Sequence, residues 1–243
     1  MKTKIQILNF LFIAIIALLI IATSCKKKDD NNSNTANGTV TDINGNVYHT
    51  VKIGTQTWML ENLRTTKFND GNAIPLVIDS TMWNNLTTSG YCWYNNEKNI
   101  YEKTYGALYN WFAVKSGKLC PAGWHVPTYS DWELLINFLG SVSIAGGKMK
   151  NIGTIEAGTG LWYAPNEGAS NESGFSGLPG GYRYYSGNFM NSLGHQGFWW
   201  SSTEYDISYS WGINLYSSNS MASITYGDKR YGFSVRCIKT IKY

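Results

Sequence analysis

The stretch GFWWSSTEYD, Gly197–Asp206, sets two adjacent tryptophans ahead of a strand-like Ser-Ser-Thr run. Successive residues of a strand point to opposite faces, so Trp199 and Trp200 cannot lie on the same face. We expect one ring in the hydrophobic core. We expect the other to lie beneath the long loop region 140–194, partly covered and at most lining a shallow site.

Three more strand-like segments follow this stretch: SWGINLYSS, MASITYG and GFSVRCIK. Together with GFWWSST they predict an antiparallel meander of four strands. In two of these segments the alternate residues on one face are apolar, namely Trp211, Ile213 and Leu215, then Phe233, Val235 and Cys237.

Upstream, the chain alternates hairpin and helix patterns. Asn44-Gly45 between two strand-like runs predicts a hairpin with a type I′ turn, and QTWMLENL predicts a third strand. Thr128 with Asp131 resembles a capping box, and Gly140 ends the helix that it opens. We expect the apolar stripe of this helix to be Trp132, Leu134, Leu135 and Leu139, and a second helix at 106–117. The fold class is α+β.

The N-terminal residues resemble an export signal. MKTKIQILN carries two lysines and no acid, and a thirteen-residue apolar run, 10–22, follows it. This run is shorter than the roughly 20 residues of a spanning helix, so it predicts a signal peptide over 1–24. An uncleaved anchor helix is the alternative.

The signal ends in ATSC, which resembles a bacterial lipobox with Ala22 where leucine is usual. The resemblance implies that Cys25 is the lipidated first residue of the mature chain, anchored by more than one acyl chain. Residues 25–38 lack large apolar side chains and predict a flexible tether. Their KKKDD run resembles the charged signals that send Bacteroidetes lipoproteins to the outer face of the outer membrane; a solvated charge run is the alternative.

The charge and the content of cysteine and histidine indicate which ligands and which disulfide to expect. Removal of Lys2 and Lys4 with the signal lowers the 20 basic residues to 18, against 16 acidic ones, so we expect no nucleic-acid partner. With Cys25 lipidated, three cysteines leave at most one intramolecular disulfide. We expect Cys120 with Cys237, although spacing leaves the other pairings open. The histidines are scattered, and we expect no metal and no cofactor.

Several motifs together resemble the Fibrobacter succinogenes major paralogous domain, a family of exported proteins and lipoproteins in the Fibrobacteres and Bacteroidetes groups. They occur in order over residues 39–243, which the resemblance implies are one domain. The motifs are DINGNVYHTVKIGTQTWMLENLRTTKFNDG (42–71), YCWYNN (91–96), YGALYNWFAV (105–114), CPAGWHVPTYSDWELL (120–135), SGFSGLPGGYR (173–183), WWSSTE (199–204) and GFSVRCIK (232–239).

The order GWHVPTYSDWE, a loop-rich middle, WWSSTE and a closing FSVRCI also resembles the C-type-lectin-like fold, which includes formylglycine-generating enzymes. This resemblance implies paired terminal strands, one or two helices and a long loop region. It carries no activity over, because Ala164-Pro165-Asn166 lacks the first oxygen ligand of a lectin calcium tripeptide. The formylglycine-generating enzymes have a pair of redox cysteines late in the chain, whereas this sequence has only Cys237 there.

Ten tryptophans and seventeen tyrosines favour a non-catalytic module that binds an extracellular glycan. Large aromatics also build the core of a loop-rich fold, and that alternative holds for any single tryptophan. The candidates for exposed rings are Trp162, Trp200, Tyr184 and Tyr185, and those for polar contacts are Glu172, Arg183 and Glu204. We also expect that Glu204 pairs with Arg183 or Arg236 within the scaffold.

Two other functions compete with glycan binding. A structural or protein-binding surface module without a small ligand fits the same sequence. A glycoside hydrolase needs two carboxylates at a set separation, for which Glu172 and Glu204 are available, but no motif marks this pair. We therefore expect an outer-membrane, lipid-anchored and surface-exposed binding protein that is not an enzyme.

Overall fold

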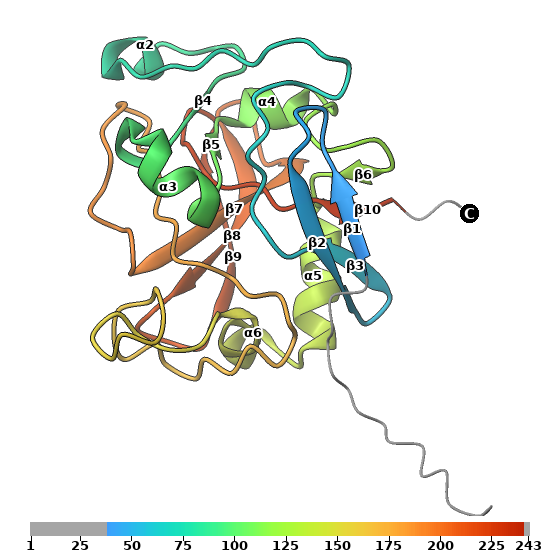
Figure 1. Cartoon of the computed structure of the whole chain (residues 1–243), viewed down its shortest axis with the longest axis vertical. Helices are drawn as coiled ribbons and strands as arrows, with labels where there is room; N and C mark the ends of the chain where they lie inside the picture. The colour runs from blue at the N-terminus through green and yellow to red at the C-terminus, as the bar shows by residue number, and fades with distance from the viewer. Residues whose placement is uncertain (1–37, 241–243) are drawn as a thin grey trace, which may run out of the picture. The chain divides into compact units, whose positions relative to one another are not determined.

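The computed structural model describes residues 38–240 (Figure 1). The expected signal peptide, Cys25 and almost all of the expected tether lie outside the described residues. Within the described part, the strands form a five-stranded sheet in the order β1-β2-β3-β10-β6, a three-stranded sheet β7-β8-β9 and a two-stranded ribbon β4-β5. The α+β class is confirmed. None of the helices described in residues 38–240 is long and apolar enough to span a bilayer.

The domain opens with the expected hairpin, β1 (Gly38–Thr41) and β2 (Val47–Ile53), followed by β3 (Gln56–Met59). The predicted turn type is wrong, because five residues, 42–46, connect the paired strands and Asn44 does not take a positive φ. The Asp42 carboxylate shapes this loop by accepting the N–H groups of Asn44 and Asn46, both at 2.9 Å. The Tyr48 hydroxyl donates to the same carboxylate at 2.6 Å.

Three strands of the expected meander are present: β7 (Gln196–Glu204), β8 (Tyr209–Tyr216) and β9 (Ala222–Asp228), all antiparallel. The fourth does not continue this sheet. Its end, β10 (Ile238–Lys239), pairs instead with β3 and with β6 (Trp124–His125). The terminal segment therefore joins the two sheets, and Ser234 bridges to Trp199 of β7 on the way.

The strongest helix prediction is confirmed as α5 (Tyr129–Phe138), which has the complete Thr128–Asp131 capping box. Its stripe needs one correction, because Leu134 is 50% exposed and Ile136 takes its place in the core. The segment expected as one helix over 106–117 is β5 (Leu108–Tyr109) followed by α4 (Trp111–Lys115). Asn110 caps α4, and its side chain accepts the N–H of Ala113.

Other short elements fill the connections: α2 (Ser80–Asn84), β4 (Tyr91–Cys92), η2 (Tyr94–Asn96), α3 (Lys98–Tyr105) and α6 (Val142–Met149). α6 lies within the region expected as a long loop, 140–194. After α6 the chain runs without a regular element until β7, along the left and lower parts of Figure 1.

The β7–β9 sheet separates two apolar cores. On one face, Trp199, Ile213 and Leu215 lie in a core that α5 and α6 cover. On the other face, Trp200 and Phe198 lie in a core with Phe233, Val235 and Cys237. The shared-face patterns read from both segments are therefore confirmed, although Trp211 itself is only partly buried.

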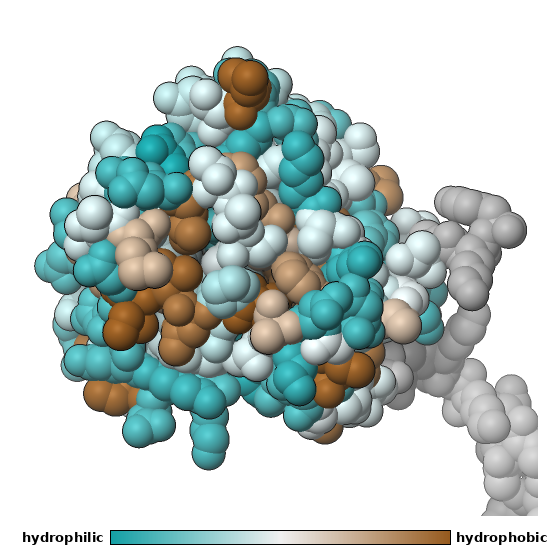
Figure 2. Space-filling model, turned by 90° about the horizontal axis from the view of Figure 1, so that it is seen from above, coloured by the Kyte–Doolittle hydropathy of each residue, from teal (hydrophilic) through white to brown (hydrophobic). Residues whose placement is uncertain are grey.

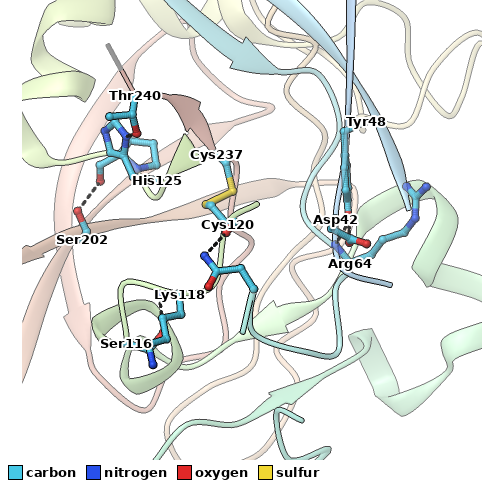
Figure 3. The surroundings of a disulfide bond; sticks show 12 residues. Asp42, Tyr48, Arg64, Ser116, Lys118, Cys120, His125, Ser202, Cys237 and Thr240 are labelled. Atoms are coloured by element: carbon cyan, nitrogen blue, oxygen red, sulfur yellow. Dashed lines mark hydrogen bonds between the residues drawn. A yellow bond between two sulfur atoms is a disulfide. The ribbon is translucent and has the colours of Figure 1, made fainter. Parts of the chain in front are cut away.

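A disulfide joins Cys120 and Cys237, the expected pair, while Cys92 is free and buried (Figure 3). The bond ties the segment before β6 to the segment before β10, 117 residues apart in sequence. His125 lies beside it, with its Nδ1 2.9 Å from the Thr240 hydroxyl, and Asn69 donates to the Cys120 carbonyl at 2.9 Å.

Candidate functional site

Trp162 and Trp200 are fully buried, so the prediction that their rings form a ligand platform is wrong. Trp200 stacks against Phe233 with ring centroids 4.3 Å apart, and its Nε1 donates to the Tyr109 carbonyl at 2.7 Å. Trp162 donates to the Gly177 carbonyl at 3.0 Å. Both rings belong to the core, which is the alternative that the sequence left open for any single tryptophan.

Arg183 is also buried, which contradicts its predicted contact with a ligand. Its guanidinium donates to the carbonyls of Gly187, Val77 and Ile78 at 2.5–2.8 Å and lies over the Trp83 ring. All these partners are backbone carbonyls or a ring face. Arg183 therefore fastens the segment before α2 to the loop at 183–187.

The two predicted carboxylates pair with cations on different elements. Glu172 lies 3.4 Å from the Lys148 ammonium of α6 and is 58% exposed at its side chain. Glu204 pairs with Lys229, so the expected pairing with Arg183 or Arg236 is wrong. Arg236 instead binds Asn62 and the Phe175 carbonyl inside the core.

Tyr184 and Tyr185 do come together, and both are half-buried. Their ring centroids lie 4.3 Å apart, and Tyr231 lies 5.1 Å from Tyr184 and 6.0 Å from Tyr185. Tyr182 supports this group through edge contacts with Tyr231 and with Phe198 below. We call Tyr182, Tyr184, Tyr185 and Tyr231 the tyrosine platform.

A tight turn holds the platform in place. Tyr184 and Asn188 are joined by a backbone hydrogen bond of 2.8 Å, and Gly187 donates to the Tyr184 carbonyl at 2.9 Å. Gly187 has φ +88°, and a Cβ there would lie 2.3 Å from the carbonyl oxygen of Ser80. Only glycine fits this approach, which presses the platform turn against the start of α2.

The next component is the segment Asp228–Tyr231, with sequence DKRY. Arg230 donates to the Asp228 carboxylate through Nε at 2.9 Å and through a terminal nitrogen at 2.7 Å. This paired guanidinium lies 5.1 Å from the centroid of the Tyr185 ring. Burial raises the pKa of Asp228, but hydrogen bonds from Arg230 outweigh it, so the pKa lies below its ordinary value.

Next to the Arg230–Asp228 pair lies a groove of about 230 Å³, which both residues of the pair help to line. Leu86, Thr87, Phe112, Ile207, Ser208 and Lys229 complete its lining. The Lys229 ammonium lies 5.0 Å from the Trp111 ring centroid and donates to the carbonyls of Asp206 and Ile207. It thereby fixes the loop between β7 and β8 that forms one wall.

Lys229 also donates to Glu204, and this hydrogen bond lowers the pKa of that carboxyl. Glu204 and Asp228 are therefore both ionised at neutral pH. A glycosidase acid must hold its proton near neutrality, which requires a raised pKa. Neither carboxylate is suited to that role.

The arrangement is suited to binding. Tyrosine rings offer apolar faces with hydroxyl groups at their edges, and a guanidinium adds fixed donors. Among residues 38–240, no three His, Cys, Asp or Glu side chains gather closely enough to hold a metal ion.

Sequence reasoning placed Tyr184, Tyr185 and Glu204 among the candidates but missed Tyr182, Tyr231, Asp228 and Arg230. The available signal was the dense DKRY segment, 228–231, where β9 ends at Asp228 and the chain leaves the sheet.

Comparison with known proteins gives a family match. The model of the Fibrobacter succinogenes major domain matches residues 51–239. No curated protein and no solved structure matches the chain.

Proposed function

The chain belongs to the Fibrobacter succinogenes major domain family, and from this membership and the site geometry we propose that it is a surface lipoprotein whose domain binds polysaccharide without cleaving it. The observation that carries the proposal is the tyrosine platform beside the Arg230–Asp228 pair. Half-exposed rings stack on the apolar faces of sugar rings, and the guanidinium and hydroxyl groups pair with sugar hydroxyls.

The location is part of the proposal. A lipid on Cys25 anchors the chain to the outer membrane, and the tether 25–38 carries the domain away from the lipid surface. The KKKDD run directs the protein to the outer face. We also propose the C-type-lectin-like arrangement. It is supported by the long loop region and by the place of β10 in one sheet with the N-terminal strands, where β10 pairs with β3 and not with the first strand β1.

Hydrolysis is disfavoured by the ionised state of Glu204 and Asp228 and by the separate pairing of Glu172 with Lys148. Protein binding is the second candidate, and one observation favours it. Figure 2 views the domain from the α2 side and shows apolar surface inside a hydrophilic rim. Around α2, Leu76, Ile78 and Met82 are 51–63% exposed.

The test is retention of the purified full chain on hydroxyethyl cellulose, xylan and dextran, with reducing-sugar release measured in the same samples. We expect saturable retention without release, reduced roughly tenfold in affinity by Tyr185→Ala. Tyr185→Phe keeps the ring and separates stacking from the hydroxyl contact with Tyr184. Tyr163→Ala is the matched control, because Tyr163 is an exposed tyrosine stacked on His195 outside the platform.

Sugar release in proportion to bound protein would contradict the non-catalytic proposal. Absence of retention on every polysaccharide would instead favour the protein-binding candidate.

A further inference from the structure

A second group of aromatic side chains lies on the face of the β7–β9 sheet opposite the core on which the tyrosine platform packs, and its Tyr209 is the cross-strand partner of Asp228. Tyr205, Tyr209 and Tyr226 are 47%, 39% and 52% exposed, and Trp211 and Tyr129 are partly exposed. Each ring contacts the next in the order Tyr129, Trp211, Tyr205, Tyr226 and Tyr209, with centroids 4.6–5.6 Å apart. We call these five residues the aromatic shelf.

The sheet register explains why the shelf is exposed. Trp211 pairs with Tyr226 across β8 and β9, and both lie on the face that carries Ile213 and Leu215. Farther along the strands, α5 and α6 cover this face and bury Ile213 and Leu215 completely. At the β7–β8 loop end, Tyr205, Tyr209 and Tyr226 keep two fifths to a half of their surface in solvent.

The shelf continues into a groove of about 350 Å³ between α5, the start of α6 and β9. Tyr129 belongs to both the shelf and the groove. Glu133, Asn137 and Ser223 supply polar groups to the groove, and Ile136, Val142 and Ile224 supply apolar walls. A carboxylate, an amide and a hydroxyl can pair with hydroxyl groups, whereas the carboxylate would repel an anionic ligand.

A purely structural role accounts for part of the shelf. Cross-strand aromatic pairs stabilise a sheet, and Trp211 with Tyr226 is such a pair. Stabilisation of the sheet does not require Tyr205 to stack on Tyr226, with an angle of 6° between the ring planes and both rings about half exposed. A row of exposed rings that ends in a polar groove without a cation is the chemistry of a binding surface for a neutral, hydroxyl-rich chain.

We propose that the aromatic shelf and its groove form a second polysaccharide-binding surface, so that one domain engages two chains or two segments of one chain. The proposal rests on the proposed function for its ligand class. The shelf proposal goes beyond the proposed function because it assigns a different surface. The platform packs on the core of Phe198 and Phe233, whereas the shelf lies on the face of the other core.

Two surfaces on one rigid domain have a consequence that one surface lacks. Binding at the second surface becomes intramolecular once the first is occupied, so retention on a dense polysaccharide exceeds that of either surface alone. The same geometry allows the protein to cross-link soluble chains.

The experiment compares the full chain with Tyr226→Ala, Tyr185→Ala and the double variant, and uses Tyr163→Ala as control. Retention on insoluble cellulose and the viscosity of hydroxyethyl cellulose solutions are measured for each, with dextran as a polysaccharide that lacks a flat ribbon shape. We expect each single variant to lose roughly tenfold in retention and to abolish the viscosity increase, and the double variant to lose retention entirely.

Two further variants protect the test against a folding defect in Tyr226→Ala. Tyr205→Ala removes an exposed ring, and Glu133→Gln alters an exposed groove residue without loss of packing. Both should keep the melting temperature and lower retention.

The outcomes separate the two proposals. If Tyr185→Ala weakens binding and all shelf variants bind as the control does, the shelf proposal is overturned and the platform stands. If only the shelf variants weaken binding, the shelf stands and the platform is wrong. If the unmodified chain binds no polysaccharide, both proposals fail.

Discussion

Trp199 and Trp200 are adjacent on β7 and point into two different cores, and neither ring is exposed to solvent. Trp199 Nε1 donates to Asn62 Oδ1 at 2.8 Å, and Trp200 Nε1 donates to the Tyr109 carbonyl at 2.7 Å. Each indole nitrogen therefore has a buried acceptor. At these two residues β7 is covered on both faces.

The first prediction concerns these two rings. Trp199→Ala and Trp200→Ala should each lower the free energy of unfolding by about 3–5 kcal/mol, because each leaves a large cavity and removes a buried hydrogen bond. Urea unfolding followed by circular dichroism measures the loss. A Trp200→Ala variant with unchanged stability and lost polysaccharide retention would contradict the burial of this ring.

Much of the fold was readable from local patterns. The capping box of Thr128 and Asp131 and the alternation of Ile213 with Leu215 are set by neighbouring residues, so they predict α5 and the core face of β8. Local patterns do not predict which strands the last strand pairs with. Phe233 and Val235 have a strand pattern, but the choice of partner depends on the distant β3 and β6.

The candidate site was harder to predict from the sequence, because it depends on which of the candidate side chains the fold buries. Arg183 and Trp162 stand in polar, glycine-rich sequence that suggests a surface loop. The fold buries both by supplying backbone carbonyls to the guanidinium and to the indole nitrogen. Such acceptors carry no side-chain signature. Tyr184 and Tyr185 stay half-exposed because the turn closed by Gly187 holds them at the edge of the core.

The second prediction concerns the disulfide. The Cys120–Cys237 bond closes a loop of more than 100 residues, for which unfolded-state entropy gives about 4–5 kcal/mol. Reduction with dithiothreitol should lower the melting temperature, and the double variant Cys120→Ser, Cys237→Ser should lower it to the same extent. Cys92→Ser is the control for loss of a thiol: it keeps the disulfide, so dithiothreitol should lower its melting temperature as much as that of the native chain. Equal stability with and without reductant would contradict this bond.

The third prediction concerns Lys150, whose side chain is fully buried. Its ammonium donates to the carbonyls of Glu167, Tyr216 and Asn219 at 2.8–2.9 Å and lies 5.5 Å from the Trp162 ring centroid. Burial lowers its pKa to about 8. Between pH 8 and the ordinary lysine pKa near 10.4, the unfolded chain therefore binds a proton that the folded chain does not.

It follows that the free energy of unfolding of the native chain, measured relative to Lys150→Met, should rise with pH between about 8 and 10.4. The difference in free energy of unfolding between the two chains removes the contribution of the buried tyrosines, because these titrate in both chains. At pH 7, Lys150→Met should be less stable by about 2–4 kcal/mol, because three carbonyls lose their donor. Urea midpoints at half-unit steps of pH measure both effects. A difference that falls with pH would contradict the lowered pKa.

The fourth prediction concerns the Asp228–Arg230 pair that positions the guanidinium over Tyr185. Asp228→Asn keeps the size of the side chain but weakens two charge-assisted hydrogen bonds, so it should weaken polysaccharide retention and lower stability by about 1 kcal/mol. Asp70→Asn is the matched control, because it breaks an exposed ion pair with Lys118 away from the platform.

The same pair sets the pH range of binding. Because the pKa of Asp228 lies below its ordinary value of 3.8, the carboxylate stays charged and its contribution is complete above that value. The contribution is lost as the pH falls through the lowered pKa of the folded state. Retention of the native chain should thus be flat from about pH 8 to 5. A midpoint for loss of retention near pH 6 in a folded chain would show that another group controls binding.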